Sequence, residues 1–174
     1  MGLSLLLLTR NAAAGAVSEY QVKAAYLYNF AKFVTFPAQS FAADNTEFVI
    51  GVLGDDPFGQ TLDQTVQGKL IGDRKIVIRR SNSIDDLKHC QIVFVCASRK
   101  KDVATVLTRF KGETVLTVGE SDGFAGHGGV INFYVDDNKV RFEINPKAAD
   151  RASLQISAQL LRLGRVVPDE QTGA

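Results

Sequence analysis

The chain is poor in the side chains that most often hold metals or activate water. Its 174 residues include two histidines and two cysteines. A structural zinc site needs four protein ligands and a catalytic one usually three, so Cys90 with the adjacent His89 supplies too few. The composition therefore predicts neither a metal centre nor a cofactor.

The sequence also lacks the glycine motifs that cradle phosphates. Residues 119–133, GESDGFAGHGGVINF, contain neither G-x-x-x-x-G-K-[ST] nor G-x-G-x-x-G, and they lead into an expected strand where a phosphate loop needs a helix. Ser121, Asp122 and His127 could be combined on paper as a catalytic triad, but nothing in the sequence positions them. An enzyme would need His127 or Cys90 in a cleft beside a base or a metal. We expect a protein that is not an enzyme.

A surplus of one charge is missing too. The chain has 20 basic and 19 acidic residues, a formal net charge of +1. Proteins that bind nucleic acid need a basic face to neutralise phosphates. The composition argues against a nucleic-acid partner.

Long apolar runs are absent beyond the first residues. Residues 1–16 hold a short leucine run, and Ala14 and Ala16 fit the small-residue pattern of a signal-peptidase site. We expect a signal peptide over residues 1–16 and a mature chain from about Val17. The run is shorter than usual and no basic residue precedes it, so a frayed N-terminus is the alternative.

The two cysteines flank a segment that is expected to be a buried strand. Six steps of extended chain separate the Cα atoms of Cys90 and Cys96 by roughly 20 Å, whereas a disulfide needs Cα atoms within about 7 Å. We therefore do not expect them to pair. Cys96 fits burial within the strand, and Cys90, at the strand entrance, is the candidate reactive thiol.

Apolar strands alternate with helices along most of the chain. A capping box at Ser18 predicts a helix to about Phe36, and strands are expected at 48–54, 75–79, 91–97 and 114–118. This alternation indicates an α/β fold, a single-domain mixed sheet with helices on both faces. We expect one domain over residues 17–167 and a disordered tail at 168–174.

Paired carboxylates follow the first of these strands. Asp55 and Asp56 could form a metal or acid–base site, because ligands gather at the carboxyl ends of strands in open α/β sheets. The stronger interpretation is structural, with Asp56 as the N-cap of a helix that has Pro57 at its first position.

The last third predicts a β-hairpin followed by a long helix. With Asp137-Asn138 as a two-residue turn, one face pairs Val135 with Val140, Phe133 with Phe142 and Ile131 with Ile144. The other face is a polar ladder: Asp136 with Lys139, Tyr134 with Arg141, and Asn132 with Glu143. This ladder is either a solvent-facing surface or the lining of a groove. Asn145 and Pro146 are expected to start one long helix that ends at Gly164.

Several blocks of the sequence resemble the YfiR/HmsC-like family. They span about residues 19–167 in order, and together they are more specific than any one alone: YLYNFAKFV (26–34) with Phe36-Pro37, GDDPFG (54–59), LTVG (116–119), GGVINF (128–133), VRFEIN (140–145), Ala148-Ala149, and LQIS (154–157) with Leu160-Leu161.

The resemblance implies a small periplasmic protein that tends to dimerise. Characterised members look like repressors that bind the periplasmic sensor domain of an inner-membrane diguanylate cyclase, and an OmpA-type outer-membrane lipoprotein relieves the repression. Such a role lowers cyclic-di-GMP and biofilm formation. Well-known members carry more cysteines and form intrachain disulfides. Cys90 matches a family cysteine whose partner is missing here, which puts redox control of the usual kind in doubt.

We therefore expect an exported regulatory protein that acts by binding another protein. Its candidate contact residues are Phe124 and His127 in the glycine-rich loop and Asn132, Tyr134, Arg141 and Glu143 on the polar ladder. Phe124 is expected to be exposed as an aromatic anchor. The rival hypothesis is a periplasmic small-molecule or anion-sensing module, in which Asn132 and Arg141 hold a carboxylate or phosphate.

Overall fold

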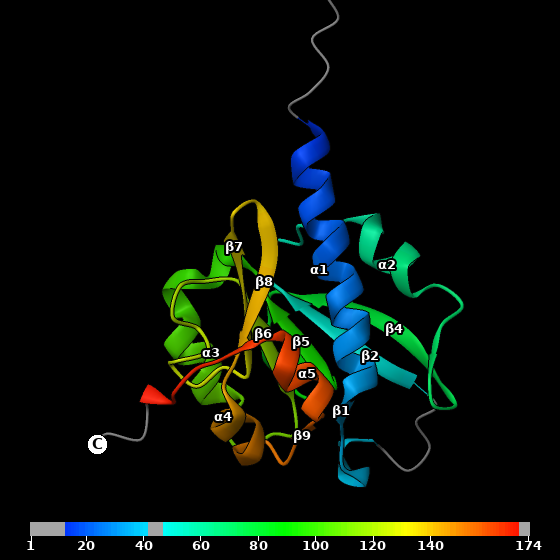
Figure 1. Cartoon of the computed structure of the whole chain (residues 1–174). Coiled ribbons are helices and arrows are strands. Elements are labelled where there is room, and N and C mark those ends of the chain that lie inside the picture. The colour runs from blue at the N-terminus through cyan, green and yellow to red at the C-terminus, as the bar shows by residue number, and fades with distance from the viewer. Residues whose placement is uncertain (1–12, 42–46, 171–174) are drawn as a thin grey trace, which may run out of the picture.

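The computed structural model describes residues 13–41 and 47–170, with side chains from residue 19 onward. A mixed sheet of eight strands lies between two layers (Figure 1). Its spatial order is β10-β8-β7-β6-β5-β2-β4-β3, and the four central strands β7, β6, β5 and β2 run parallel. The strands are β2 Glu47–Leu53, β3 Leu70–Ile71, β4 Arg74–Ser81, β5 Ile92–Val95, β6 Leu116–Gly119, β7 Ile131–Asp136, β8 Lys139–Ile144 and β10 Arg165–Val166.

Helices cover both faces of this sheet. One face packs on α1, α2 and α5 through residues such as Phe30, Leu62 and Leu160, and the other packs on η2 and α3 through Leu87 and Val106. The predicted α/β class is confirmed. The helices are α1 Ala13–Phe33, α2 Gln60–Val66, α3 Val103–Arg109, α4 Pro146–Arg151 and α5 Ala158–Leu163, with 3-10 turns η1 Ala38–Ser40, η2 Asp85–Leu87 and η3 Ala97–Asp102.

Within the described ranges, no helix has both the length and the hydropathy that a membrane crossing requires. The predicted signal peptide falls mostly outside the described residues. Helix α1 already begins at Ala13, so Ser18 lies inside the helix and is not its N-cap, contrary to the prediction. The helix also ends at Phe33, before the predicted stop, because Val34–Thr35 forms the short strand β1.

The second predicted N-cap is also wrong. Helix α2 begins at Gln60 after Gly59, and Asp56 instead closes a tight turn by accepting a hydrogen bond from the backbone N–H of Phe58, 2.8 Å away. Its other carboxylate oxygen accepts from Arg80 Nε at 2.7 Å. Asp56 is thus a structural ion-pair partner rather than a cap.

The predicted hairpin is confirmed pair by pair, from Ile131 beside Ile144 to Asp136 beside Lys139. Asp137 and Asn138 have φ angles of 48° and 56°, as a two-residue turn of this kind requires. Phe133 and Phe142 turn toward α1, where Tyr26 and Phe30 pack against them. The hairpin thereby joins the core on one face and leaves its polar ladder on the other.

The predicted long C-terminal helix is wrong, because it is two short helices joined by a strand. Asn145 caps α4 as expected, accepting from the Ala148 N–H at 3.0 Å. The chain then turns at Ser153, where φ is 58°, and β9 (Gln155–Ile156) pairs antiparallel with β1. The Ser157 side chain caps α5. The apolar residues of this segment therefore reach the core from two short helices and a strand as well as they would from one long helix.

The start of the predicted disordered tail packs against the body of the protein. The Val167 N–H donates to the Ile144 carbonyl at 2.9 Å and the Glu170 N–H to the Gly126 carbonyl at 3.0 Å. Asp169 is buried and forms an ion pair with Arg151. The prediction is therefore wrong for residues 168–170, and residues 171–174 lie outside the described part.

Candidate interaction surface

The glycine-rich loop between β6 and β7 folds around Phe124 instead of exposing it. The Phe124 side chain is fully buried against the core on the α3 face. A Cβ atom at Gly119 would lie 2.3 Å from the Phe124 ring, and one at Gly129 would lie 2.2 Å from it. These two glycines therefore let the ring lie across the loop. The prediction of Phe124 as an exposed anchor is wrong.

The same loop contains the spacing of a nucleophile elbow, contrary to the expectation that the sequence has none. Gly119, Ser121 and Gly123 fit the letters G-x-S-x-G, which in hydrolases mark a serine on a sharp turn between a strand and a helix. Here β6 ends at Gly119, and residues 120–130 form turns with no helix among them. The loop therefore lacks the geometry that exposes and activates such a serine.

Of the two candidate contact residues in the loop, His127 is the exposed one. Its Nε2 lies 3.5 Å from a carboxylate oxygen of Glu170, so the imidazole faces the tail segment. It also lines a shallow hollow of about 590 Å³ with Lys100, Lys101 and Glu120. Contact between His127 and a partner remains a prediction.

The polar ladder is partly buried within the protein. Asn132 and Glu143 are 2% and 8% exposed, and Asn132 Nδ2 donates to Glu143 Oε1 at 3.3 Å. A guanidinium nitrogen of Arg165, from β10, lies 2.6 Å from the other Glu143 oxygen. Asn132 and Glu143 are therefore not available to a rigid partner, contrary to the expectation of an open ladder.

Arg165, on β10, also contacts the polar ladder, and the sequence did not predict this contact. Its guanidinium also lies 4.6 Å from the centre of the Tyr134 ring, a cation–π contact. The pairing of β10 with β8 brings it there, and a two-residue strand after Gly164 has no sequence pattern of its own. Arg141 is exposed and pairs with Asp136 at 3.1 Å.

This arrangement does not support the anion-sensing hypothesis. That hypothesis needs Asn132 and Arg141 side by side in one groove. Asn132 is buried against Glu143, whereas Arg141 lies at the solvent surface and pairs with a carboxylate. The structure does not bring the two side chains into a common site.

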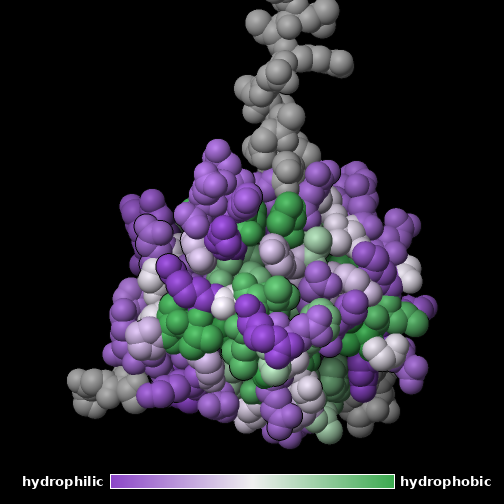
Figure 2. Space-filling view, viewed as in Figure 1, coloured by the Kyte–Doolittle hydropathy of each residue, from purple (hydrophilic) through white to green (hydrophobic). Residues whose placement is uncertain are grey.

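Apolar side chains gather instead beside the hairpin, on the α1 side of the molecule. Leu163 is 67% exposed, Val135 53% and Val22 39%. Figure 2 shows hydrophobic atoms over α1 and α5 at the centre of this face, with hydrophilic residues around them. We call Val22, Tyr26, Val135, Val140 and Leu163 the α1–hairpin surface.

Two adjoining hollows shape this surface. One of about 640 Å³ lies between α1 and the hairpin turn, and one of about 380 Å³ lies between β8 and α5. Tyr26, Lys139 and Val140 line both, so the hollows are continuous. Arg141 and Arg165 border the second, which places cations at the edge of an apolar groove.

A buried polar cluster holds α1 in place behind this surface. Lys23 Nζ lies 2.8 Å from a Glu120 carboxylate oxygen, and their side chains are only 4% and 5% exposed. The Ala97 N–H and the Tyr20 hydroxyl also donate to this carboxylate. Burial and the Glu120 charge raise the pKa of Tyr20 above its ordinary value, so this hydroxyl stays protonated. Glu120 thus ties α1 to the carboxyl ends of β5 and β6.

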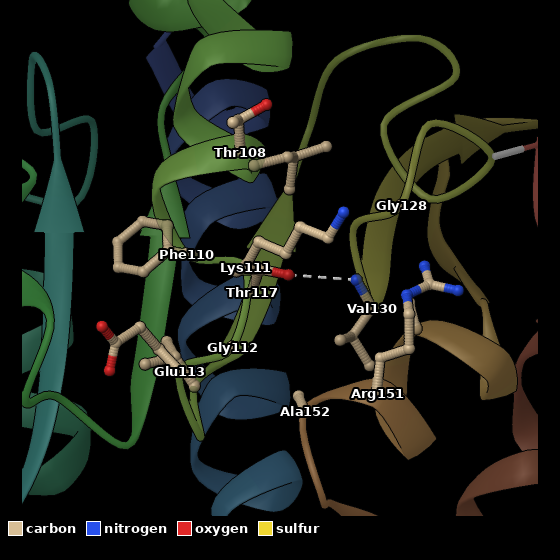
Figure 3. Close-up of a pocket in the computed structure, with 13 residues that line it drawn as sticks. Thr108, Phe110, Lys111, Gly112, Glu113, Thr117, Gly128, Val130, Arg151 and Ala152 are labelled. Atoms are coloured by element: carbon tan, nitrogen blue, oxygen red, sulfur yellow. Dashed lines mark hydrogen bonds between the residues drawn. The ribbon is translucent and has the colours of Figure 1, made fainter.

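A hollow of about 360 Å³ lies on the other face, between α3 and α4 (Figure 3). Its lining includes neither histidine nor cysteine. The Thr117 hydroxyl accepts from the Val130 N–H at 3.1 Å, and Arg151 is paired with Asp169. Thr117 and Arg151 therefore already have structural partners.

The structure does not favour Cys90 as a reactive thiol. Both cysteines are free and buried, and Cys90 is 2% exposed. Burial raises the pKa of the Cys90 thiol to about 11. Because the thiolate is the reactive form, burial argues against the predicted reactivity of Cys90.

Solved structures of low sequence identity share the fold. The chain is similar to an ABC domain from Streptococcus pneumonia, solved with L-Trp, with a TM-score of 0.51 and 12% identity over 88% of this chain and 60% of that one. It is also similar to a conserved domain protein from Vibrio cholerae, with a TM-score of 0.53 and 10% identity over 68% of this chain and 54% of that one. This chain thus spans little more than half of either protein.

No curated protein matches the sequence. The model of the YfiR/HmsC-like family matches residues 20–165, from within α1 to the first residue of β10. This range includes the hairpin, the Glu120 cluster and all five residues of the α1–hairpin surface. The chain therefore belongs to the YfiR/HmsC-like family.

Proposed function

We propose that this protein is an exported regulator that represses a membrane-bound diguanylate cyclase by binding its periplasmic sensor domain. Repression lowers cyclic-di-GMP and biofilm formation. Membership in the YfiR/HmsC-like family supports a regulatory role in the periplasm. The observation that carries the proposal is the α1–hairpin surface, since a contiguous apolar patch with a polar edge is typical of a protein-binding site.

The binding surface in this proposal differs from the one expected from the sequence. Val135 and Leu163 are the most exposed side chains of the α1–hairpin surface and act as the anchors. Arg141, Arg165 and Tyr134 form the polar edge, where charges steer the encounter with the sensor domain. His127 lines a different hollow and contributes to a separate contact.

The other partners belong to the same proposal. An OmpA-type outer-membrane lipoprotein relieves the repression by sequestering this protein. The protein also forms a homodimer. Binding of the lipoprotein and formation of the homodimer each need a part of the protein surface that is accessible when the sensor domain is not bound.

Aspartate substitutions at the anchors test the proposal. Val135→Asp and Leu163→Asp place a charge where the interface excludes water, and each is expected to weaken binding about tenfold or more. Leu70→Asp is the matched control, because Leu70 is 51% exposed but lies on β3, at the opposite edge of the sheet. The readouts are recovery of the cyclase from solubilised membranes and the cellular level of cyclic-di-GMP.

The expected result is loss of cyclase recovery and a rise in cyclic-di-GMP for the two anchor variants only. Circular dichroism confirms that each variant is folded, since substitutions at exposed positions cost little stability. Wild-type protein that recovers no cyclase contradicts the proposed function. Anchor variants that recover it as well as Leu70→Asp contradict the proposed surface.

A further inference from the structure

Strand β4 leaves most of one edge of the sheet open. Strand β2 pairs with β4 from Lys75 to Ser81, but β3 pairs with it only at Arg74 and Lys75. Beyond these two residues, no strand in the described part of the chain lies along the outer side of β4. Figure 1 shows β4 at the side of the sheet, below α2.

The backbone of this edge can still form hydrogen bonds. The Ser81 carbonyl accepts from the Gly54 N–H at 3.2 Å, so the backbone polar groups of Ser81 face β2. Backbone groups alternate in direction along a strand. Those of Ile78 and Arg80 therefore face outward, where an added strand would meet them.

The two faces of this edge differ in chemistry. On the α2 side, Ile76 and Ile78 are half-exposed and border an open groove of about 450 Å³ with Val66 and three glutamines. Arg80 forms ion pairs with Asp56 and with Asp63, which itself lines the groove. This side can accept apolar side chains.

The opposite face of β4 is basic. Lys75 and Arg79 are exposed on either side of Val77, and neither forms an ion pair within the described residues. Arg79 makes one long hydrogen bond, 3.4 Å, to the Asp86 carbonyl. Two cations four positions apart on one face of a strand match carboxylates with the same spacing on a neighbouring strand.

We propose that the open edge of β4 binds an extended acidic segment of another protein, which adds a strand to the sheet. Its main chain bonds to Ile78 and Arg80, its alternate apolar side chains enter the groove beside Ile76 and Ile78, and its carboxylates face Lys75 and Arg79. This mode of recognition takes affinity from the backbone and specificity from alternate side chains. It does not depend on the proposed cyclase partner.

A second copy of this chain fits the edge poorly. Antiparallel pairing of two β4 strands would bring Lys75 and Arg79 of both copies onto one face, and like charges across strands are destabilising. The charge of the edge therefore favours an acidic partner over self-association.

A model peptide tests this site. The probe is a capped, fluorescent peptide of about seven residues, the length of a typical strand, in which glutamate alternates with valine. We expect it to bind the full chain, and a peptide with lysine in place of glutamate not to bind. Lys75→Glu/Arg79→Glu is expected to weaken binding about tenfold or more, whereas Lys100→Glu/Lys101→Glu, with the same change in net charge elsewhere, leaves it unchanged.

Methylating the peptide's backbone amides separates strand addition from simple charge attraction. Methyl groups on the amides that face β4 are expected to abolish binding, and methyl groups on the alternate amides are expected to be tolerated. The proposal is overturned if the glutamate peptide does not bind the wild-type chain or if both charge-reversed variants bind it equally well. It is also overturned if both methylated peptides bind the wild-type chain equally well. Sedimentation tests whether the edge pairs with a second copy instead. If the wild-type chain self-associates and only the Lys75→Glu/Arg79→Glu variant changes this, the edge binds a second copy and the proposal is overturned.

Discussion

Gly119 is constrained by a side chain five positions further along the chain. The space that a Cβ atom would need at Gly119 is filled by the Phe124 ring. Gly119→Ala forces this buried ring to move, so we expect a loss of about 1–3 kcal/mol in the free energy of unfolding, measured by urea denaturation.

A double-mutant cycle isolates the cause of this loss. Phe124→Ala is destabilising by itself because it leaves a cavity. In that background, Gly119→Ala should cost much less, since its Cβ no longer meets the ring. If the two costs simply add, the close approach of Phe124 is not what requires glycine at position 119.

Cys90 carries a second prediction at the residue scale. Burial raises its pKa from 9.0 to about 11, so the native protein keeps the thiol proton where the unfolded chain loses it. The stability from this thiol is complete below pH 9.0 and is lost as the pH rises toward 11. We expect a thiol reagent to label Cys90 in urea and not in native protein at pH 8. Cys90→Ala should reduce the alkaline loss of stability, and rapid labelling of native Cys90 would refute its burial.

A buried charge pair adds to the apolar contacts that dock helix α1. Lys23→Met leaves the Glu120 carboxylate buried without its cation, and we expect a loss of about 3 kcal/mol in the free energy of unfolding. Lys23→Met/Glu120→Gln should recover part of that loss, because it removes the uncompensated charge. The measurements are chemical denaturation and hydrogen exchange of the α1 amides, and a double variant no more stable than Lys23→Met would contradict this account.

Elements were predictable where neighbouring residues set their geometry. The hairpin needs a turn that tolerates positive φ at Asp137 and Asn138, and only one register puts all its apolar pairs on one face, so its pairing could be read in advance. Helix caps were less predictable, because Asp56 can accept a hydrogen bond in a turn as well as at a helix start. The single long C-terminal helix failed because the antiparallel partner of β9 is β1, far away in the sequence.

The whole molecule is expected to unfold as one unit. The two apolar clusters lie on opposite faces of the same sheet, and the tail is bonded to both the loop and the end of β8. If either apolar cluster unfolds, one face of the sheet is exposed, and the cluster on the opposite face loses the support of that sheet. Urea transitions followed by far-ultraviolet circular dichroism and by tyrosine fluorescence should therefore coincide. Separate midpoints would show that the faces unfold independently.

The sequence by itself determined the fold class, the hairpin register and the family resemblance, because each follows from local periodicity, turn chemistry or short blocks of residues. It also indicated a role in binding rather than catalysis. Only the tertiary structure decided which side chains are exposed: Phe124, Asn132 and Glu143 are buried, while Val135, Leu163 and the edge of β4 remain open. Exposure is a property of what packs over a residue, and that neighbour is fixed by the path of the whole chain rather than by the local pattern.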